Sequence, residues 1–296
     1  MLRGPVAKLR QCTRHNSSVS LAFDVVKRAQ SSGKGVSPLV IMHGLLGNKS
    51  NNRTLARYLR DSLGRDVYLV DMRNHGSSPH TASHTYSDMA GDINRFVNAQ
   101  GLERPVLVGH SMGAKAAMAT ALTYPDLASA IVCLDNAPVC TAPQGKYALY
   151  MTALERLCNN PQITTLQEAD AAMVATEPDK FVRGFLLTVL KRVKAGDELR
   201  SWRFESRVPL GTLRQAVLQG EISAWPWDAR RDRWSGPALF VRGTESHYMA
   251  DEYIAATGMQ FPRFELRDVK AGHYLNATHP RECADLITDF LERQQE

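Results

Sequence analysis

Short apolar segments alternate with segments of helical periodicity along most of the chain. The apolar segments have strand length, are rich in Val, Ile and Leu, and lie at residues 38–42, 67–70, 106–108, 131–134 and 238–241. A less apolar segment at 264–269 predicts a further strand, nearer an edge. Helical patterns lie between the strands, for example at 52–63, 87–98, 112–123 and 281–293. This alternation predicts the α/β class, with a mostly parallel sheet covered by helices on both faces.

The alternation stops after residue 134, and the next apolar strand segment begins at about residue 238. Helical patterns fill the interval, most clearly at 147–157 and 165–175. We therefore expect one domain over residues 20–295, with a helical cap inserted at about 139–235. The insert contains Trp202, Trp225, Trp227 and Trp234. These side chains either pack a small core of the insert or face a substrate cavity beneath it.

The first 19 residues differ in composition from the rest of the chain. They are basic and contain serines, and the first acidic residue of the chain is Asp24. This composition is typical of a mitochondrial presequence, so we expect a mitochondrial protein; a basic tail on a cytosolic protein is the alternative. Without the basic residues of this segment the net charge falls from +6 to +2, which disfavours nucleic acid as a partner. The basic residues are Arg3, Lys8, Arg10 and Arg14.

The remaining composition excludes several other classes of protein. The five cysteines are widely spaced and form no Cys-x-x-Cys pair, so we expect neither a disulfide scaffold nor a metal site. The longest apolar segments have strand length, well short of the roughly 18 to 20 residues that span a bilayer. We expect a monomer that has no membrane span and needs no cofactor.

The strongest chemical signal is the segment Gly-His-Ser-Met-Gly at 109–113. It follows a predicted strand and opens a predicted helix, which is the context of the Gly-x-Ser-x-Gly nucleophile elbow. Such a turn strains the serine backbone and raises the hydroxyl above the sheet. The start of the following helix favours a developing negative charge nearby. The pattern therefore predicts Ser111 as a nucleophile.

A second signal is His-Gly-Leu-Leu-Gly at 43–47, directly after a predicted strand. In folds with this elbow, one oxyanion-binding N–H comes from this loop and the other from the residue after the nucleophile. We assign these to Leu45 and Met112. His43 is expected to hold the loop by hydrogen bonds, and Asp71 and Arg73 are expected to be structural in the loop after the next strand.

The general base should lie late in the chain, because the order in this fold is serine, acid, histidine. Only His247, His273 and His279 follow the candidate acids. His273 lies after the last strand and before the final helix, where a loop can bring an imidazole over the elbow. His279 precedes Pro280, which suits the first turn of a helix. We therefore favour His273.

Two residues are candidates for the acid. The usual position lies three residues after the glycine that ends the strand at 238–243, and Ser246 occupies it. Glu245 stands one residue earlier, whereas Asp135 directly follows the strand at 131–134, beside the elbow. Either could orient His273 and stabilise the imidazolium if its carboxylate lies within hydrogen-bond distance of the imidazole. We favour Asp135 and keep Glu245 as the alternative.

Several segments together resemble one known family. They are His-Gly-Leu-Leu-Gly at 43–47, Asn-Asn-Arg at 51–53, the loop at 71–79, Gly-His-Ser-Met-Gly-Ala-Lys at 109–115, Asp-Asn-Ala-Pro at 135–138 and Gly-His at 272–273. Over residues 20–295 the chain is similar to the mitochondrial α/β-hydrolase domain-containing protein 11 group, especially its fungal branch with the yeast ethanol acetyltransferases. The resemblance implies the α/β-hydrolase fold, with the cap after strand six of its usual arrangement, and an acid at Asp135. It also implies ester or thioester chemistry.

These observations predict acyl transfer through an acyl-enzyme on Ser111. Water as acceptor gives an esterase or thioesterase, and an alcohol gives an acyltransferase. The expected partners are a small acyl ester, an acyl-CoA or a short alcohol, with acetyl-CoA as a possible substrate. A basic stretch in the cap either forms a solvated face or contacts coenzyme A phosphates. The alternative function is a non-catalytic binding protein. The basic stretch comprises Arg192, Lys194, Arg200, Arg203 and Arg207.

Overall fold

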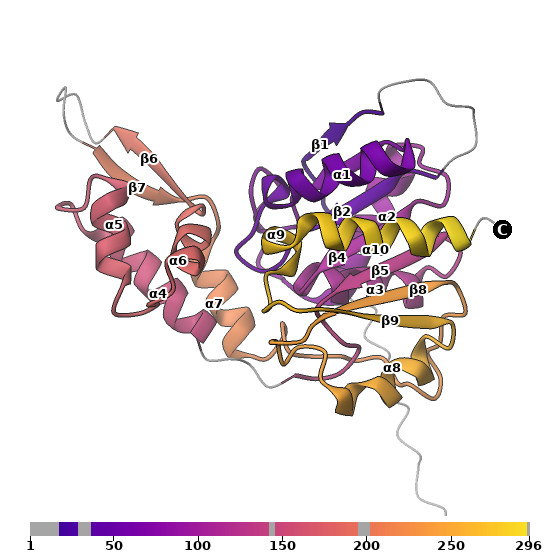
Figure 1. Cartoon of the computed structure of the whole chain (residues 1–296). Helices are drawn as coiled ribbons and strands as arrows, with labels where there is room; N and C mark the ends of the chain where they lie inside the picture. The colour runs from indigo at the N-terminus through magenta and orange to yellow at the C-terminus, as the bar shows by residue number, and fades with distance from the viewer. Residues whose placement is uncertain (1–17, 29–36, 142–145, 195–201, 295–296) are drawn as a thin grey trace, which may run out of the picture.

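The computed structural model describes residues 18–28, 37–141, 146–194 and 202–294 of the 296-residue chain. The expected presequence at 1–19 thus lies almost entirely outside the described residues. The described residues form a core around one sheet and an insert that stands beside it (Figure 1).

The core sheet contains seven strands in the order β1-β3-β2-β4-β5-β8-β9. All neighbouring pairs are parallel except β1 with β3, which confirms the mostly parallel sheet. β1 is an edge strand that the pattern did not predict, because none of its residues is buried and it forms no fully apolar run. The strands are β1 (Phe23–Val26), β2 (Leu39–Met42), β3 (Val67–Val70), β4 (Val106–His110), β5 (Ala130–Leu134), β8 (Ala238–Gly243) and β9 (Phe264–Val269).

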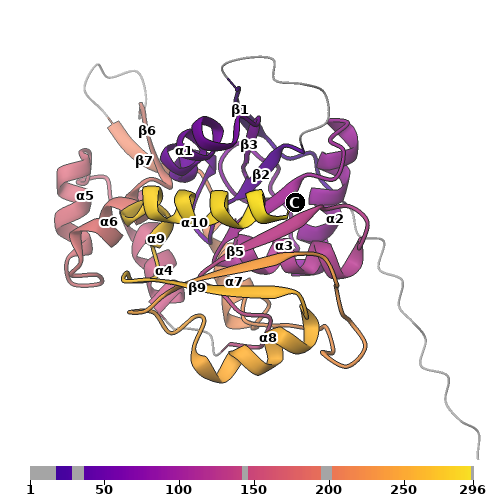
Figure 2. The same cartoon turned by 45° about the vertical axis from the view of Figure 1, so that its right-hand side comes forward.

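Helices cover both faces of this sheet, because successive residues of the buried strands point to opposite faces. On β2, Leu39 and Ile41 pack in one cluster with α1, α9 and α10, whereas Val40 and Met42 pack in the other with α2 and α3. Figures 1 and 2 show α1 and α10 together on one face. The helices are α1 (Arg53–Leu63), α2 (Tyr86–Ala99), α3 (Met112–Thr123), α8 (Ile254–Gln260), α9 (Leu275–Thr278) and α10 (Pro280–Arg293), with short 3₁₀ turns at Lys49–Asn52 and Asp251–Tyr253.

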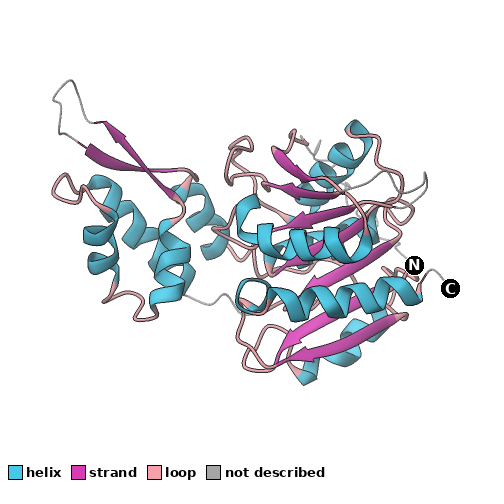
Figure 3. Ribbon diagram, turned by 45° about the horizontal axis from the view of Figure 1, so that its top comes forward, coloured by secondary structure: helices cyan, strands magenta, loops and turns pink. Residues whose placement is uncertain are grey.

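The insert lies between β5 and β8, and we call its elements from α4 to α7 the cap. It contains a two-stranded antiparallel ribbon, β6 with β7, at its outer end (Figures 1 and 3). The insert is thus mainly helical, as expected, and it also contains a ribbon that the sequence pattern did not predict. Most ribbon residues are polar and only Leu190 and Phe204 are buried, so no apolar segment marked these strands. The cap elements are α4 (Lys146–Asn159), α5 (Leu166–Met173), α6 (Lys180–Leu187), β6 (Leu190–Lys194), β7 (Trp202–Ser206) and α7 (Leu210–Leu218).

After α7 the chain returns along the core, and three of the four tryptophans of the insert pack in this segment. The rings of Trp225 and Trp227 lie 4.7 Å apart, and Trp225 Nε1 donates a hydrogen bond to Gln260. Trp234 Nε1 donates to the carbonyl of Pro125. The fourth, Trp202, lies in the ribbon. Of the two roles considered for these side chains, the described contacts are those of packing.

Candidate active site

Ser111, Asp135 and His273 converge where β4, β5 and β9 end. The carboxyl ends of parallel strands are the usual ligand-binding edge of an open α/β sheet. His273 Nε2 lies 2.9 Å from Ser111 Oγ, and His273 Nδ1 lies 2.7 Å from Asp135 Oδ2. Because a carboxylate can only accept, the proton of His273 is on Nδ1, and Nε2 is free to accept the hydroxyl proton of Ser111.

The elbow that carries Ser111 depends on close backbone approach. Ser111 has φ 54° and ψ −116°, and it directly precedes the first residue of α3. A Cβ atom on Gly109 would lie 2.1 Å from the carbonyl oxygen of Gly113, and one on Gly113 would lie 2.4 Å from that of Met42. Glycine at both positions thus allows the strand and the helix to meet while the serine adopts its strained conformation.

Asp135 is fully buried and is held by more than His273. Its Oδ1 accepts a hydrogen bond from the backbone N–H of Gly243 at 3.1 Å, and its Oδ2 also accepts from the hydroxyl of Ser246. Ser246 stands in the position where this fold usually carries its acid, so here that position supports the acid from β5 instead.

Glu245, the alternative acid, lies in a different environment. Glu245 is exposed, and its backbone N–H donates a hydrogen bond to the carbonyl of Ala271. Among the described hydrogen bonds, the imidazole of His273 meets Asp135 and Ser111, and none joins it to the carboxylate of Glu245. The geometry thus brings together Asp135 and His273.

Aromatic rings on several sides fix the orientation of His273. The ring of Tyr248 stacks on the imidazole, with centroids 3.9 Å apart and an interplanar angle of 22°. His110 Nε2 donates to the carbonyl of His273 at 2.7 Å. Tyr147, from the cap, lines a cavity beside His273 together with Tyr248 and Tyr274. The sequence reasoning missed these tyrosines, and only the adjacency of Tyr274 to His273 could have indicated one of them.

Two buried histidines shape the loop that contains Leu45. His43 Nδ1 donates to the carbonyl of Gly44 and its Nε2 accepts from the N–H of Met72. His75 Nε2 accepts from the N–H of Leu46, whose φ is 62°. His43 therefore has the structural role expected of it. Leu45 and Met112 border the same cavity as Ser111, which is the placement that an oxyanion site requires.

Burial keeps the histidines around this loop neutral. It lowers the pKa of His43 and His75 below the ordinary value of 6.5, and that of His84 and His110 to about 3. Desolvation is the main cause in each case, because a charged imidazole loses its water and gains no carboxylate partner that would compensate. As neutral rings, they can each donate through one nitrogen and accept through the other.

Ion pairs and hydrogen bonds of two charged residues, Arg73 and Asp71, hold the loop after β3. The guanidinium of Arg73 pairs with both oxygens of Asp92, at 2.6 and 2.8 Å, and both side chains are buried. Asp71 pairs with Lys49 Nζ at 2.9 Å and accepts from the backbone N–H of Ser77. Arg73 and Asp71 are thus structural, as expected, although each has its own partner.

Three cavities border the site. A narrow one of about 40 Å³, which we call the serine cavity, contains Ser111 and is lined by Leu45, Met112, Tyr86, Tyr147, Tyr248, Val217 and Ile222. Another of about 370 Å³, the histidine cavity, is lined by His273, Tyr147, Tyr150, Glu177, Tyr248 and Tyr274. Tyr147 and Tyr248 belong to both cavities and separate the serine side from the histidine side.

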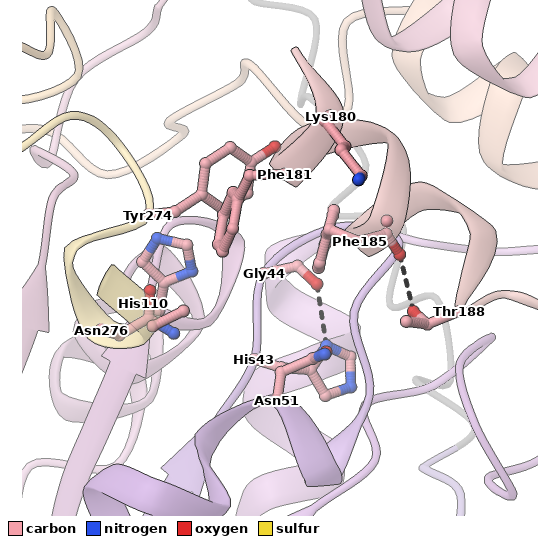
Figure 4. Close-up of a pocket in the computed structure, with 12 residues that line it drawn as sticks. His43, Gly44, Asn51, His110, Lys180, Phe181, Phe185, Thr188, Tyr274 and Asn276 are labelled. Atoms are coloured by element: carbon pink, nitrogen blue, oxygen red, sulfur yellow. Dashed lines mark hydrogen bonds between the residues drawn. The ribbon is translucent and has the colours of Figure 1, made fainter. Parts of the chain in front are cut away.

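The third cavity, the α6 cleft, has a volume of about 590 Å³ and lies between α6 of the cap and the core. Figure 4 shows Phe181 and Tyr274 side by side at its wall, with His110 beneath Tyr274. Its lining is mainly apolar, and Gly44 and His110, which adjoin Ser111 in space, form its floor. None of the tryptophans of the insert is among the residues that line these three cavities.

The basic stretch of the insert lies on and after the ribbon. The guanidinium of Arg203 pairs with Glu205, and that of Arg192 stacks over the ring of Trp202 at 4.5 Å. Arg200 lies outside the described residues. In the part of the chain that the structure describes, no helix is both long and apolar enough to cross a membrane.

Comparisons with known proteins agree with this architecture. The family model described as the alpha/beta hydrolase fold matches residues 37–280. A probable alcohol acetyltransferase of Saccharomyces cerevisiae is 46% identical over 290 residues, covering 94% of this chain and 85% of the relative. The mouse sn-1-specific diacylglycerol lipase ABHD11 is 35% identical, covering 86% of this chain and 80% of its own. A marine microorganism esterase of known structure superimposes with a TM-score of 0.80 at 28% identity, covering 92% of this chain and 100% of its own. The chain therefore belongs to the α/β-hydrolase family, in the ABHD11-like group that includes the fungal alcohol acetyltransferases.

Proposed function

We propose that this member of the ABHD11-like group is a serine-dependent acyl-transfer enzyme, in which Ser111 is the nucleophile, His273 the general base and Asp135 the acid. One observation carries the proposal: a hydrogen-bonded chain runs from Ser111 Oγ through His273 to the buried Asp135, at 2.9 and 2.7 Å. A nucleophile in contact with a base that a third group orients is the arrangement that activates a hydroxyl.

The reaction has two halves. In the first, His273 takes the proton of Ser111 as Oγ attacks the acyl carbonyl, and the N–H groups of Leu45 and Met112 bind the negative oxygen. His273 then gives its proton to the leaving group, which departs and leaves an ester on Ser111. In the second half, His273 deprotonates the acceptor, which attacks this ester and releases Ser111.

The acceptor decides which product forms. Water gives esterase or thioesterase activity, and a short alcohol gives an ester by transfer. The identity to a probable alcohol acetyltransferase over most of the chain supports acetyl transfer from acetyl-CoA to ethanol as the specific reaction. A thiolate is a good leaving group and needs little help from an acid, so the same residues serve acyl-CoA and oxygen esters. Within the basic stretch, the guanidinium of Arg203 is already paired with Glu205, so Arg203 by itself does not favour a coenzyme A site.

The experiment that tests this function is incubation of the purified protein with acetyl-CoA, with and without ethanol, while acetate and ethyl acetate are measured. We expect acetate in both reactions and ethyl acetate only with ethanol. Labelling by a fluorophosphonate probe separates the alternative, since a non-catalytic binding protein would neither react with the probe nor release acetate.

We further propose that the protein acts in mitochondria and loses its basic N-terminal segment there. The support is the acid-free composition before Asp24. Sequencing of the native protein from isolated mitochondria should give a new N-terminus between about residues 10 and 25. Intact Met1 on protein from a cytosolic fraction would refute this location.

A further inference from the structure

Lys115 is a fully buried lysine on α3, four residues after Ser111. Its Nζ donates hydrogen bonds to the carbonyl of Val139 at 2.8 Å and to that of Ser223 at 3.2 Å. Val139 lies where the chain leaves β5 for the cap, and Ser223 lies where it returns after α7. One ammonium on the helix of Ser111 therefore holds both segments that connect the cap to the core.

The surroundings of this ammonium make it costly. Nζ lies 5.6 Å from the centre of the Tyr86 ring, and no described ion pair provides a carboxylate for it. Burial lowers the pKa of Lys115 to about 8. An apolar residue in this position would avoid the desolvation of a charge, which usually exceeds what neutral hydrogen bonds return. In return for this cost, Lys115 fixes the positions of the carbonyls of Val139 and Ser223.

The two connecting segments form one wall of the serine cavity. Thr141 of the first segment and Ile222 and Ser223 of the second line it. The N–H of Thr141 donates to the carbonyl of Ser223 at 3.1 Å, and the hydroxyl of Tyr86 donates to that of Ile222 at 2.8 Å. Lys115 thus binds the carbonyl of Ser223 from behind this wall and limits how far the wall can move from Ser111.

Under the proposed function, the groups that meet the acyl carbonyl border the serine cavity, so we assign the acyl chain to this side of the site. The acyl carbon bonds to Ser111 Oγ while its oxygen meets Leu45 and Met112, all of which border this cavity. The leaving group must lie next to His273, which borders the histidine cavity on the other side of Tyr147 and Tyr248. A volume of about 40 Å³ has room for only a few groups of the size of water.

We propose that Lys115 is a positioning residue that sets the acyl-chain length, because it holds the connecting segments against the serine cavity so that only short acyl groups fit. The proposal rests on the proposed function, since it assigns the acyl side of the same site. A short acyl group is the one that the alcohol acetyltransferase activity named for a relative would transfer.

The first test compares Lys115→Met with the wild type on p-nitrophenyl esters from acetate to octanoate. We expect wild-type kcat/KM to fall about tenfold or more between butanoate and hexanoate, because excess methylenes in a filled pocket cost that much. In Lys115→Met the hexanoate-to-acetate ratio should rise about tenfold, since the wall can yield. The matched control is Thr120→Val on the same helix, where the Thr120 hydroxyl donates a hydrogen bond to the carbonyl of Ala116; it should leave the ratio unchanged.

A second variant and a pH series keep the test decisive if Lys115→Met does not fold. Ile222→Ala trims the wall itself and should raise the same ratio. In the wild type the ratio should rise above about pH 8, where the ammonium of Lys115 loses its charge. The titratable groups beside it are Tyr86, whose pKa burial raises, and the thiol of Cys140. His273 acts on both esters in the same way, so it should not change the ratio of kcat/KM for hexanoate to kcat/KM for acetate.

Each remaining outcome overturns a defined part of the account. An unchanged ratio in folded Lys115→Met, with a raised ratio in Ile222→Ala, would make Lys115 merely structural. A constant ratio in both variants and across pH would mean that the serine cavity does not bind the acyl chain. Absence of turnover and of fluorophosphonate labelling in the wild type would instead refute the proposed function.

Discussion

The core and the cap of this molecule are built in opposite ways. Around Ser111 the core encloses polar side chains that hold one another, such as Arg73 with Asp92 and His273 with Asp135. The cap leaves large apolar side chains in solvent, with Leu149 of α4 62% exposed and Leu218 of α7 65% exposed. From this difference we expect two tasks: the core should hold the reacting groups in place, whereas the cap should shape the space that a substrate enters.

This division predicts how substitutions act. Changes at the ends of the core strands should remove chemistry by several orders of magnitude. Changes in the cap should alter which substrate is used, with smaller effects on rate and stability.

Ser111→Ala should abolish fluorophosphonate labelling and lower kcat by about 10⁶, leaving only the catalysis that binding and the oxyanion site provide. The fold should survive, because the Ser111 backbone makes its hydrogen bond to Leu134 whatever the side chain. Hydrolysis of p-nitrophenyl acetate and circular dichroism measure the two effects. Labelling that persists in the variant would show that another residue is the nucleophile.

Asp135→Asn should lower kcat by about 10⁴, because the neutral amide no longer holds His273 in the tautomer that accepts a proton from Ser111. Glu245→Gln is the matched control: it removes the charge of a nearby exposed carboxylate and should cost less than about tenfold. Steady-state kinetics on one ester suffice. A dead Glu245→Gln with an active Asp135→Asn would reverse the assignment, and partial loss in both would indicate shared duty.

Acid should destabilise the core through its buried histidines. The folded pKa of His84 and of His110 is about 3, below the unfolded value of 6.5, so each takes up a proton on unfolding in this range. Each should therefore lower the free energy of unfolding by about 1.4 kcal/mol per pH unit as pH falls from 6.5 towards 3.

Urea unfolding at several pH values measures this slope. His84→Gln offers the sharper comparison, because a residue that does not titrate should give a shallower slope than the wild type. An equal slope in both proteins would contradict the buried neutral state of His84.

Phe181→Ala in the cap should have the smallest effect. The ring lies 5.7 Å from that of Tyr274 at the wall of the α6 cleft and is 45% exposed. Its loss should change stability by less than about 1 kcal/mol and raise KM for bulky esters severalfold, with kcat nearly constant. A large drop in kcat for acetate would show that the cap takes part in the chemistry.

The sequence predicted the core well because local patterns of residues determine its main features. The apolar runs of β2, β4 and β5 are buried on both faces, and the elbow requires Gly109 and Gly113, so short patterns suffice to predict both. The preference for Asp135, with Glu245 kept as the alternative, rested on its place directly after a strand and on the family resemblance. The structure adds that Ser246 fills the usual position of the acid and bonds to Asp135.

The cap was predicted less well, because little in it is determined locally. The ribbon of β6 and β7 is mostly polar and packs through single residues such as Phe204. No periodic pattern of apolar residues therefore predicted these two strands. The tyrosines around His273 come from α4, from the loop after β8 and from the loop after β9. Only tertiary structure brings Tyr147 to Tyr248 and Tyr274.

The most direct test of the central claim is to trap the acyl-enzyme. The protein is mixed with excess p-nitrophenyl acetate, quenched with acid within milliseconds and digested, and the peptides are analysed by mass spectrometry. We predict a single acetyl group on Ser111 that appears with a burst of p-nitrophenol and is absent from Ser111→Ala. Steady turnover with no acetyl group on Ser111, or with the acetyl group on another residue, would contradict it.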